Sequence, residues 1–116
     1  MRLVLFGSLA IAAATHVNFA TAASLTGSEG DVRSRPYLGD STGGCTKVWK
    51  QYVAASGHSA YATTPYSRMA EAIICGSSIN AGSKAAAEAR ALDQCNAGLK
   101  HWKMSAVRKC ALSASK

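Results

Sequence analysis

The feature that most constrains this fold is a set of four cysteines in a short chain of 116 residues. In an oxidising compartment, an even number of cysteines in a small exported protein indicates a disulfide framework. Four cysteines allow three connectivities, and their number alone leaves all three open. The four are Cys45, Cys75, Cys95 and Cys110.

Residues 1–22 have the pattern of a signal peptide. Arg2 supplies a positive start, 3–14 is an uninterrupted apolar run, and 20–22 reads Ala-Thr-Ala, the small-x-small site of signal peptidase. An uncleaved membrane anchor is the alternative, but the apolar run is well short of the roughly 20 residues that a membrane span needs. We therefore expect cleavage and export to the periplasm or the cell exterior as a soluble protein.

Charge is distributed unevenly along the rest of the chain. The net charge is +7, and the signal peptide contributes only that of Arg2. Residues 23–44 are rich in Gly, Ser and Thr without apolar periodicity, and are predicted to be a disordered leader. Segment 99–116 contains five basic residues and no acid, which predicts a basic surface in the last quarter of the chain.

Two segments carry helical signals. Apolar residues recur on one helical face between Cys45 and Val53. The sequence from Lys84 is rich in Ala, the strongest helix former, and follows a candidate N-cap at Ser83. Its small alanines would let this helix lie close against a sheet, and Gly98 either ends the helix or weakens it.

Three short segments are predicted strands. Residues 58–64 alternate weakly and end at a proline turn. Residues 71–78 include an Ile-Ile-Cys run that periodicity alone cannot assign, and the Gly-Ser-Ser after it favours a strand over a helix. Residues 108–113 give the third strand. The sequence thus predicts an α+β domain over 45–116, in the order α-β-β-α-β, with both helices on one face of a three-stranded sheet and two disulfides.

The pattern Ala-Leu-x-x-Cys at 91–95, followed by Cys-x-Leu-x-Ala at 110–114, resembles a signature of small exported proteobacterial domains of unknown function. Trp-x-x-Tyr at 49–52 is similar to the helix that precedes their first strand. The chain departs from the pattern at 72–76, where those domains carry Tyr-Gly or Trp-Gly. The resemblance implies the α+β fold and brings no established activity.

The same resemblance implies a disulfide between Cys95 at the end of a helix and Cys110 at the opening of the last strand. These two elements are also neighbours in the sequence. We predict this bond together with one between Cys45 and Cys75.

Groups for catalysis or metal binding are sparse. Cys75 with His58 would suggest a thiol nucleophile, but cysteines in an exported chain of this kind are normally oxidised. Beyond the signal segment the histidines are His58 and His101, and no Cys-x-x-Cys pair is present, so no metal site is predicted. The acids are too dispersed for a catalytic carboxylate pair. We expect a protein without enzymatic activity or cofactor.

The segment 57–61, from Gly57 to Tyr61, is loosely similar to loops of periplasmic lysozyme inhibitors. Those inhibitors are β-barrels, whereas this chain has two helical segments, and its basic body would repel a basic lysozyme. A helix-to-strand turn with Gly57 as the C-cap is the simpler interpretation. An enzyme inhibitor acting through 57–61 is the alternative function, and an enzyme without a recognisable motif is a third class.

The basic residues near the end of the chain are the best lead to a function. Positive charge beside an aromatic ring suits anionic polymers or lipid headgroups, and a surface that only maintains solubility is the competing interpretation. For Trp102 a core position is the alternative, because it continues the apolar face of its helix. We predict a monomeric, non-catalytic, envelope-associated module that binds an anionic envelope polymer or a membrane surface, with no specific nucleic-acid motif. The candidate residues are Lys100, His101, Trp102, Lys103, Arg108 and Lys109.

Overall fold

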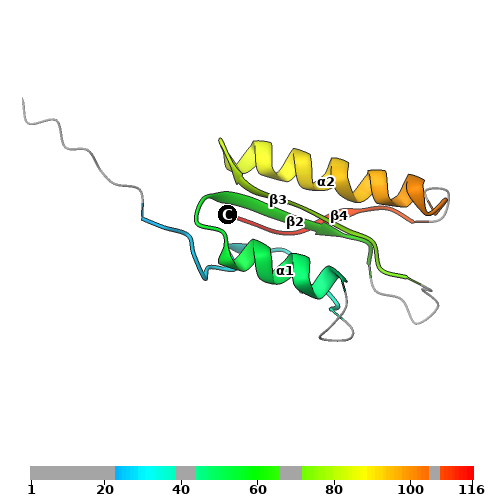
Figure 1. Cartoon of the computed structure of the whole chain (residues 1–116), viewed down its shortest axis with the longest axis horizontal. Coiled ribbons are helices and arrows are strands. Elements are labelled where there is room, and N and C mark those ends of the chain that lie inside the picture. The colour runs from blue at the N-terminus through cyan, green and yellow to red at the C-terminus, as the bar shows by residue number, and fades with distance from the viewer. Residues whose placement is uncertain (1–22, 39–43, 66–71, 105–107) are drawn as a thin grey trace, which may run out of the picture.

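A computed structural model describes residues 23–38, 44–65, 72–104 and 108–116. The predicted signal peptide, 1–22, lies outside these described residues. The described residues form two helices and four strands, in an α+β arrangement (Figure 1). In chain order they are β1 (Asp31–Val32), α1 (Gly44–Ala54), β2 (His58–Thr63), β3 (Cys75–Ala81), α2 (Lys84–His101) and β4 (Ala111–Ser115).

The strands form one antiparallel sheet in the order β1-β4-β2-β3. β2 is central, and its Tyr61 lies opposite Ser77 of β3 on one side and Ala114 of β4 on the other. The three predicted strands are therefore present, but the prediction of a three-stranded sheet was wrong. The fourth strand, β1, comes from the segment expected to be a leader, and it pairs with the outer edge of β4 at Asp31 and Val32.

The two helices cover opposite faces of the sheet, which corrects the prediction that both pack on one face (Figure 1). Side chains along a strand alternate between faces. In β2, Ala60 and Ala62 pack in the cluster that includes the buried face of α2, whereas Tyr61 packs in the cluster built on α1. The result is a helix-sheet-helix sandwich with a core on each side.

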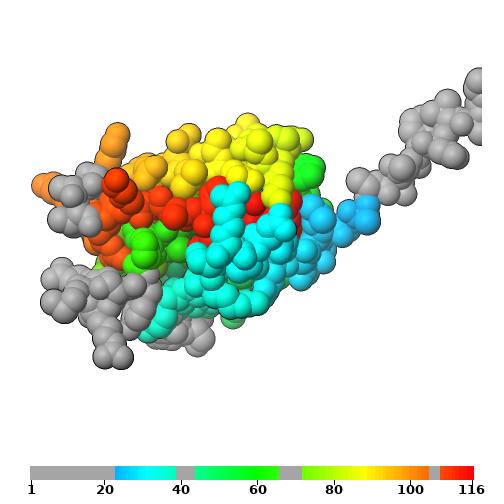
Figure 2. Space-filling view, turned by 180° about the vertical axis from the view of Figure 1, so that it is seen from behind, coloured from blue at the N-terminus to red at the C-terminus, as the bar shows by residue number. Residues whose placement is uncertain are grey.

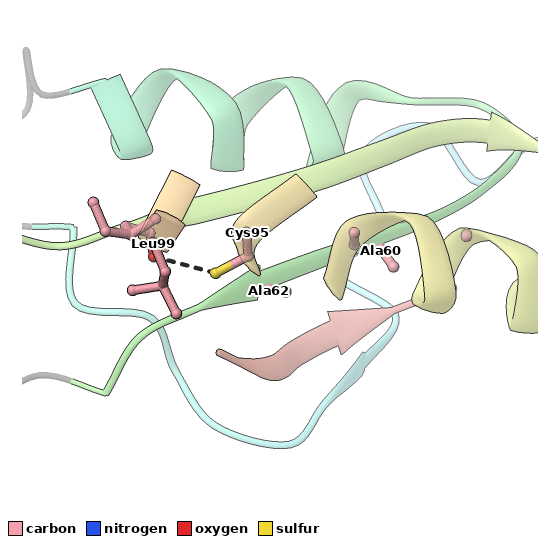
Figure 3. Packing of buried hydrophobic residues seen from close by; sticks show 7 residues of the cluster. Ala60, Ala62, Cys95 and Leu99 are labelled. Atoms are coloured by element: carbon pink, nitrogen blue, oxygen red, sulfur yellow. Dashed lines mark hydrogen bonds between the residues drawn. The ribbon is translucent and has the colours of Figure 1, made fainter. Parts of the chain in front are cut away.

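The α2 face is packed through small residues (Figure 3). Ala87 and Ala91 of α2 are fully buried, as the alanine-rich sequence predicted. Opposite them in β3 stands Gly76, where a Cβ atom would lie 2.4 Å from the backbone nitrogen of Cys95. Gly98 does not end α2 but lies within it, where a Cβ would come 2.8 Å from Ile74. The backbones of α2 and β3 are therefore almost in contact.

The α1 face is packed through aromatic rings. The Trp49 ring centroid lies 5.2 Å from those of Tyr52 and Tyr61, and the Tyr61 ring meets it edge-on at 82°. Edge-on pairs at this spacing contribute about 1 kcal/mol beyond the buried area. Burial raises the pKa of Tyr52 and of Tyr61 to about 12.

The disulfides are Cys45–Cys75 and Cys95–Cys110, which confirms the predicted pairing. The first joins α1 to β3 and the second joins α2 to the segment before β4, so each helix is tied covalently to the sheet on its own face. Sequence separations of 30 and 15 residues correspond to about 3 to 4 kcal/mol each in the chain-entropy account.

Residues 23–38 lie against the domain, which corrects the prediction of a disordered leader for this part of 23–44 (Figure 2). The Leu25 N–H donates to the Ser56 carbonyl at 2.9 Å, and the Gly27 N–H donates to the Val53 carbonyl at 2.8 Å. The buried Tyr52 hydroxyl donates to the Glu29 carbonyl at 2.7 Å. The prediction failed because this segment buries few apolar side chains and is held instead by its backbone groups, which composition does not reveal.

Removing this segment should therefore destabilise the domain. A chain that begins at residue 37 loses strand β1 and the carbonyl that accepts from the Tyr52 hydroxyl, and we expect a cost of about 1 to 3 kcal/mol. In a domain of this size that corresponds to a Tm lowered by roughly 5 to 15 °C relative to a chain that begins at residue 23. Scanning calorimetry of the two chains checks this, and equal melting temperatures would show that the segment does not stabilise the domain.

Candidate anion-binding surface

The end of α2 is shaped by a helix-stopping motif that turns its basic residues outward. The Lys103 N–H donates to the Lys100 carbonyl at 3.1 Å, and the Met104 N–H donates to the Leu99 carbonyl at 2.8 Å, the two hydrogen bonds of a Schellman motif. Lys103 has the left-handed φ of 55° that glycine usually supplies there. Met104 folds back onto the core beside Leu99, which leaves Trp102 and Lys103 on the outside.

Trp102 is exposed and not part of the core. The residue is 65% exposed, the highest value among the large apolar residues in the described part of the chain. The His101 ring lies edge-on to it, with the ring centroids 5.2 Å apart. The core alternative for Trp102 is therefore wrong, and an apolar indole stands in solvent.

Lys100, Lys103 and Lys109 surround this end with positive charge. All three are exposed, and none forms an ion pair within the described residues. Together with the two aromatic residues they form what we call the basic end. Its members are Lys100, His101, Trp102, Lys103 and Lys109.

Ion pairing occurs instead at the opposite end of α2. Lys84, the first residue of the helix, pairs with Asp31 and holds the pKa of that carboxyl below its usual value. Arg33 pairs with Glu88, one turn further along. The 18 residues of α2 span about 27 Å, so this balanced end is far from the basic end (Figure 1).

Arg108 has a structural role and is not counted in the basic end, and its assignment as an anion-binding residue stays a prediction. Its guanidinium donates to the Pro65 carbonyl at 2.8 Å and also to the Ala72 carbonyl. These bonds join the segment before β4 to the residues just after β2 and just before β3. A guanidinium committed to two carbonyls has fewer donors left for a ligand.

Lys116 was also counted in the basic surface, but it is only 6% exposed. Its three N–H donors are shared among four backbone carbonyls within 3.1 Å of the ammonium nitrogen, two in the segment 25–28 and two at the end of α1. It lies 5.1 Å from the Tyr52 ring centroid. Burial lowers the pKa of this lysine. Lys116 therefore ties elements together and cannot meet a ligand at the surface.

The segment 57–61 is largely inaccessible. Ser59, Ala60 and Tyr61 are fully buried in the central strand, and the Gly57 N–H donates to the Asn80 side chain at 2.8 Å. Only Gly57 and His58 reach the surface. An inhibitory loop needs consecutive exposed side chains, so the geometry gives no support to the inhibitor alternative.

The described residues contain no cluster of three or more groups able to hold a metal, and no helix among them is long and apolar enough to cross a membrane. Comparison with known protein families, curated proteins and solved structures finds no match to this chain. The resemblance to exported proteobacterial domains therefore stays a prediction that rests on its sequence motifs.

Proposed function

We propose that this protein is a non-catalytic, exported module that binds the anionic lipid headgroups of an envelope membrane through its basic end. The observation that carries the proposal is the exposed Trp102 indole among lysines that have no ion-pair partner in the described part of the chain. Both disulfides are consistent with an oxidising compartment.

The indole favours a lipid surface over a soluble anionic polymer. Tryptophan combines an apolar ring system with one N–H donor, and it partitions to the boundary between hydrocarbon and headgroups. A sulfated or carboxylated polymer offers no hydrocarbon layer for the ring, so its binding would depend mainly on the lysines. Each lysine near an anionic surface contributes about 1 kcal/mol, so three favour anionic over neutral vesicles by on the order of 100-fold.

The lysines can be tested with a charge-matched control. The variant K100Q/K103Q/K109Q should lose most of its binding to anionic vesicles in a flotation assay. The control K47Q/K50Q/R90Q removes the same charge from exposed residues elsewhere that form no ion pair with the described residues, and it should retain most of its binding. Both should keep the parent stability within about 0.5 kcal/mol per site. Equal losses in the two variants would mean that the basic end is only part of a diffuse positive field.

The role of Trp102 separates lipid from polymer. Trp49 is buried, so a blue shift of fluorescence on adding anionic vesicles should come from Trp102 and should vanish in W102F. W102A should weaken vesicle binding while leaving retention on heparin unchanged. Absence of a blue shift, with heparin binding intact, would replace the lipid surface by an anionic polymer as the partner.

A further inference from the structure

A hollow of about 520 Å³ lies beside the basic end, between the second half of α2 and the segment that leads into β4. On the α2 side it is lined by Asp93, Asn96 and Lys100. These residues have the i, i+3 and i+7 spacing that places side chains on one helical face. On the other side it is lined by Arg108 and Lys109.

The two walls of the hollow are fixed relative to each other. The disulfide Cys95–Cys110 joins α2 to the residue that follows Lys109. Arg108 is anchored by its bonds to the Pro65 and Ala72 carbonyls. A ligand would therefore meet a site whose width is set before binding, which reduces the entropy cost of binding.

The charges in this hollow are not paired with one another. Asp93 is the one acid among the described residues that has no ion pair, although Lys100 and Lys109 line the same hollow. The other described acids, Glu29, Asp31 and Glu88, are each paired with a basic residue. Unpaired charges of both signs around one hollow suit a ligand that also carries both signs.

We propose that the hollow binds a phosphoryl group with a short hydrogen-bond-donating arm, of which phosphoethanolamine is the simplest member. The phosphate lies between Lys100 and Lys109, and the ammonium arm meets the carboxylate of Asp93. The Asn96 amide can donate to the phosphate or accept from the arm. The site deepens the proposed function, and it rests on that function for its source of ligand, a headgroup presented by a membrane.

The test uses soluble compounds and the whole protein. Isothermal titration should show phosphoethanolamine binding at least about threefold tighter than inorganic phosphate, the size of one exposed ion pair. D93N should abolish this preference, and K100Q/K109Q should weaken both compounds. The control E29Q removes the same charge from a carboxylate outside the hollow, and it should leave the ratio of the two affinities nearly unchanged. Equal affinities in the parent protein, an unchanged ratio in D93N, or no binding of either compound would overturn the site.

Vesicle experiments separate this inference from the proposed function. D93N should still bind anionic vesicles, whereas W102A should still bind soluble phosphoethanolamine. If the protein binds vesicles but shows no preference for phosphoethanolamine, the inference about the hollow is wrong and the proposed function stands. If it prefers phosphoethanolamine but does not bind vesicles, the proposed membrane partner is wrong. Vesicles that contain phosphoethanolamine lipid should displace the free compound. Failure to displace it would assign the hollow to a soluble phosphate compound and overturn the membrane source.

Discussion

Replacing Gly76 with alanine should lower the free energy of unfolding by about 3 kcal/mol, the upper part of the range for overpacked cores. The new Cβ would lie 2.4 Å from the backbone nitrogen of Cys95 and 2.6 Å from the Ala91 carbonyl oxygen. Both atoms belong to the backbone of α2, so no side-chain rotation can make room. The helix must move away from the sheet, and the disulfide Cys95–Cys110 restricts that movement.

Gly82 offers a matched control for this substitution. A Cβ at Gly82 would meet nothing within 4 Å, so the same chemical change there should alter stability by less than about 0.5 kcal/mol. Denaturant unfolding of both variants under non-reducing conditions gives the comparison. If the alanine at 76 were as well tolerated as the alanine at 82, close contact between β3 and α2 would not be a feature of this fold.

Gly76 also explains why β3 was placed too early in the sequence. The strand was predicted at 71–78 because of the apolar pair Ile73 and Ile74. The Gly-Ser-Ser that follows was interpreted as the end of that strand. The observed strand is Cys75–Ala81, so those small residues lie inside it. They are needed there because α2 crosses at Gly76, and because β3 is an edge strand with less demand for apolar side chains. Tertiary packing thus overrode local propensity.

The sequence of β2 indicates that a helix covers each face of the sheet, but this signal was not recognised. A strand covered on one face alternates apolar with polar residues. Here Ala60 and Ala62 alternate with Tyr61, that is, small with large, and all three are fully buried. The small side faces the alanines of α2, and the large side faces the aromatic residues of α1. Alternation in size rather than polarity is a signal of burial on both faces.

The helices and the disulfides were predictable because their signals are local. Helical spacing marked α1, and the alanine content with an N-cap at Ser83 marked α2; the Ser83 side chain does accept from the Ala86 N–H at 3.1 Å. The exposure of Trp102 was not predictable. It depends on the turn at Lys103, where a lysine occupies a position that glycine would normally mark in the sequence.

The roles of Arg108 and Lys116 could not be read from the sequence, because a basic residue looks the same whether its partners are solvent or backbone carbonyls. Both contact segments far away in the chain. Asp93 and Asn96 were missed for a different reason. The sequence shows that they share a helical face with Lys100. The opposite wall of the hollow comes from 108–109, and only the folded structure brings this segment beside α2.

Replacing Lys116 with methionine should destabilise the protein by about 3 kcal/mol, because methionine keeps the bulk of the side chain but donates no hydrogen bond. Four carbonyls would lose the ammonium as a donor, and those of Leu25 and Val53 would keep only the N–H groups of Ser28 and Gly27. The four carbonyls belong to Leu25 and Ser28 at 2.8 and 3.1 Å, and to Val53 and Ala55 at 3.0 and 2.7 Å. The last two close the end of α1, where a cation also favours the helix dipole.

The same substitution should release the segment 25–28 before the rest of the domain unfolds. Amide exchange at Leu25 and Gly27, which donate to Ser56 and Val53, should accelerate in K116M while exchange in the central strand follows the overall stability. The control K109M makes the identical change at an exposed lysine and should leave both quantities nearly unaltered. If K116M matched K109M in stability and in exchange at these two amides, Lys116 would not be the tie between this segment, α1 and the end of β4.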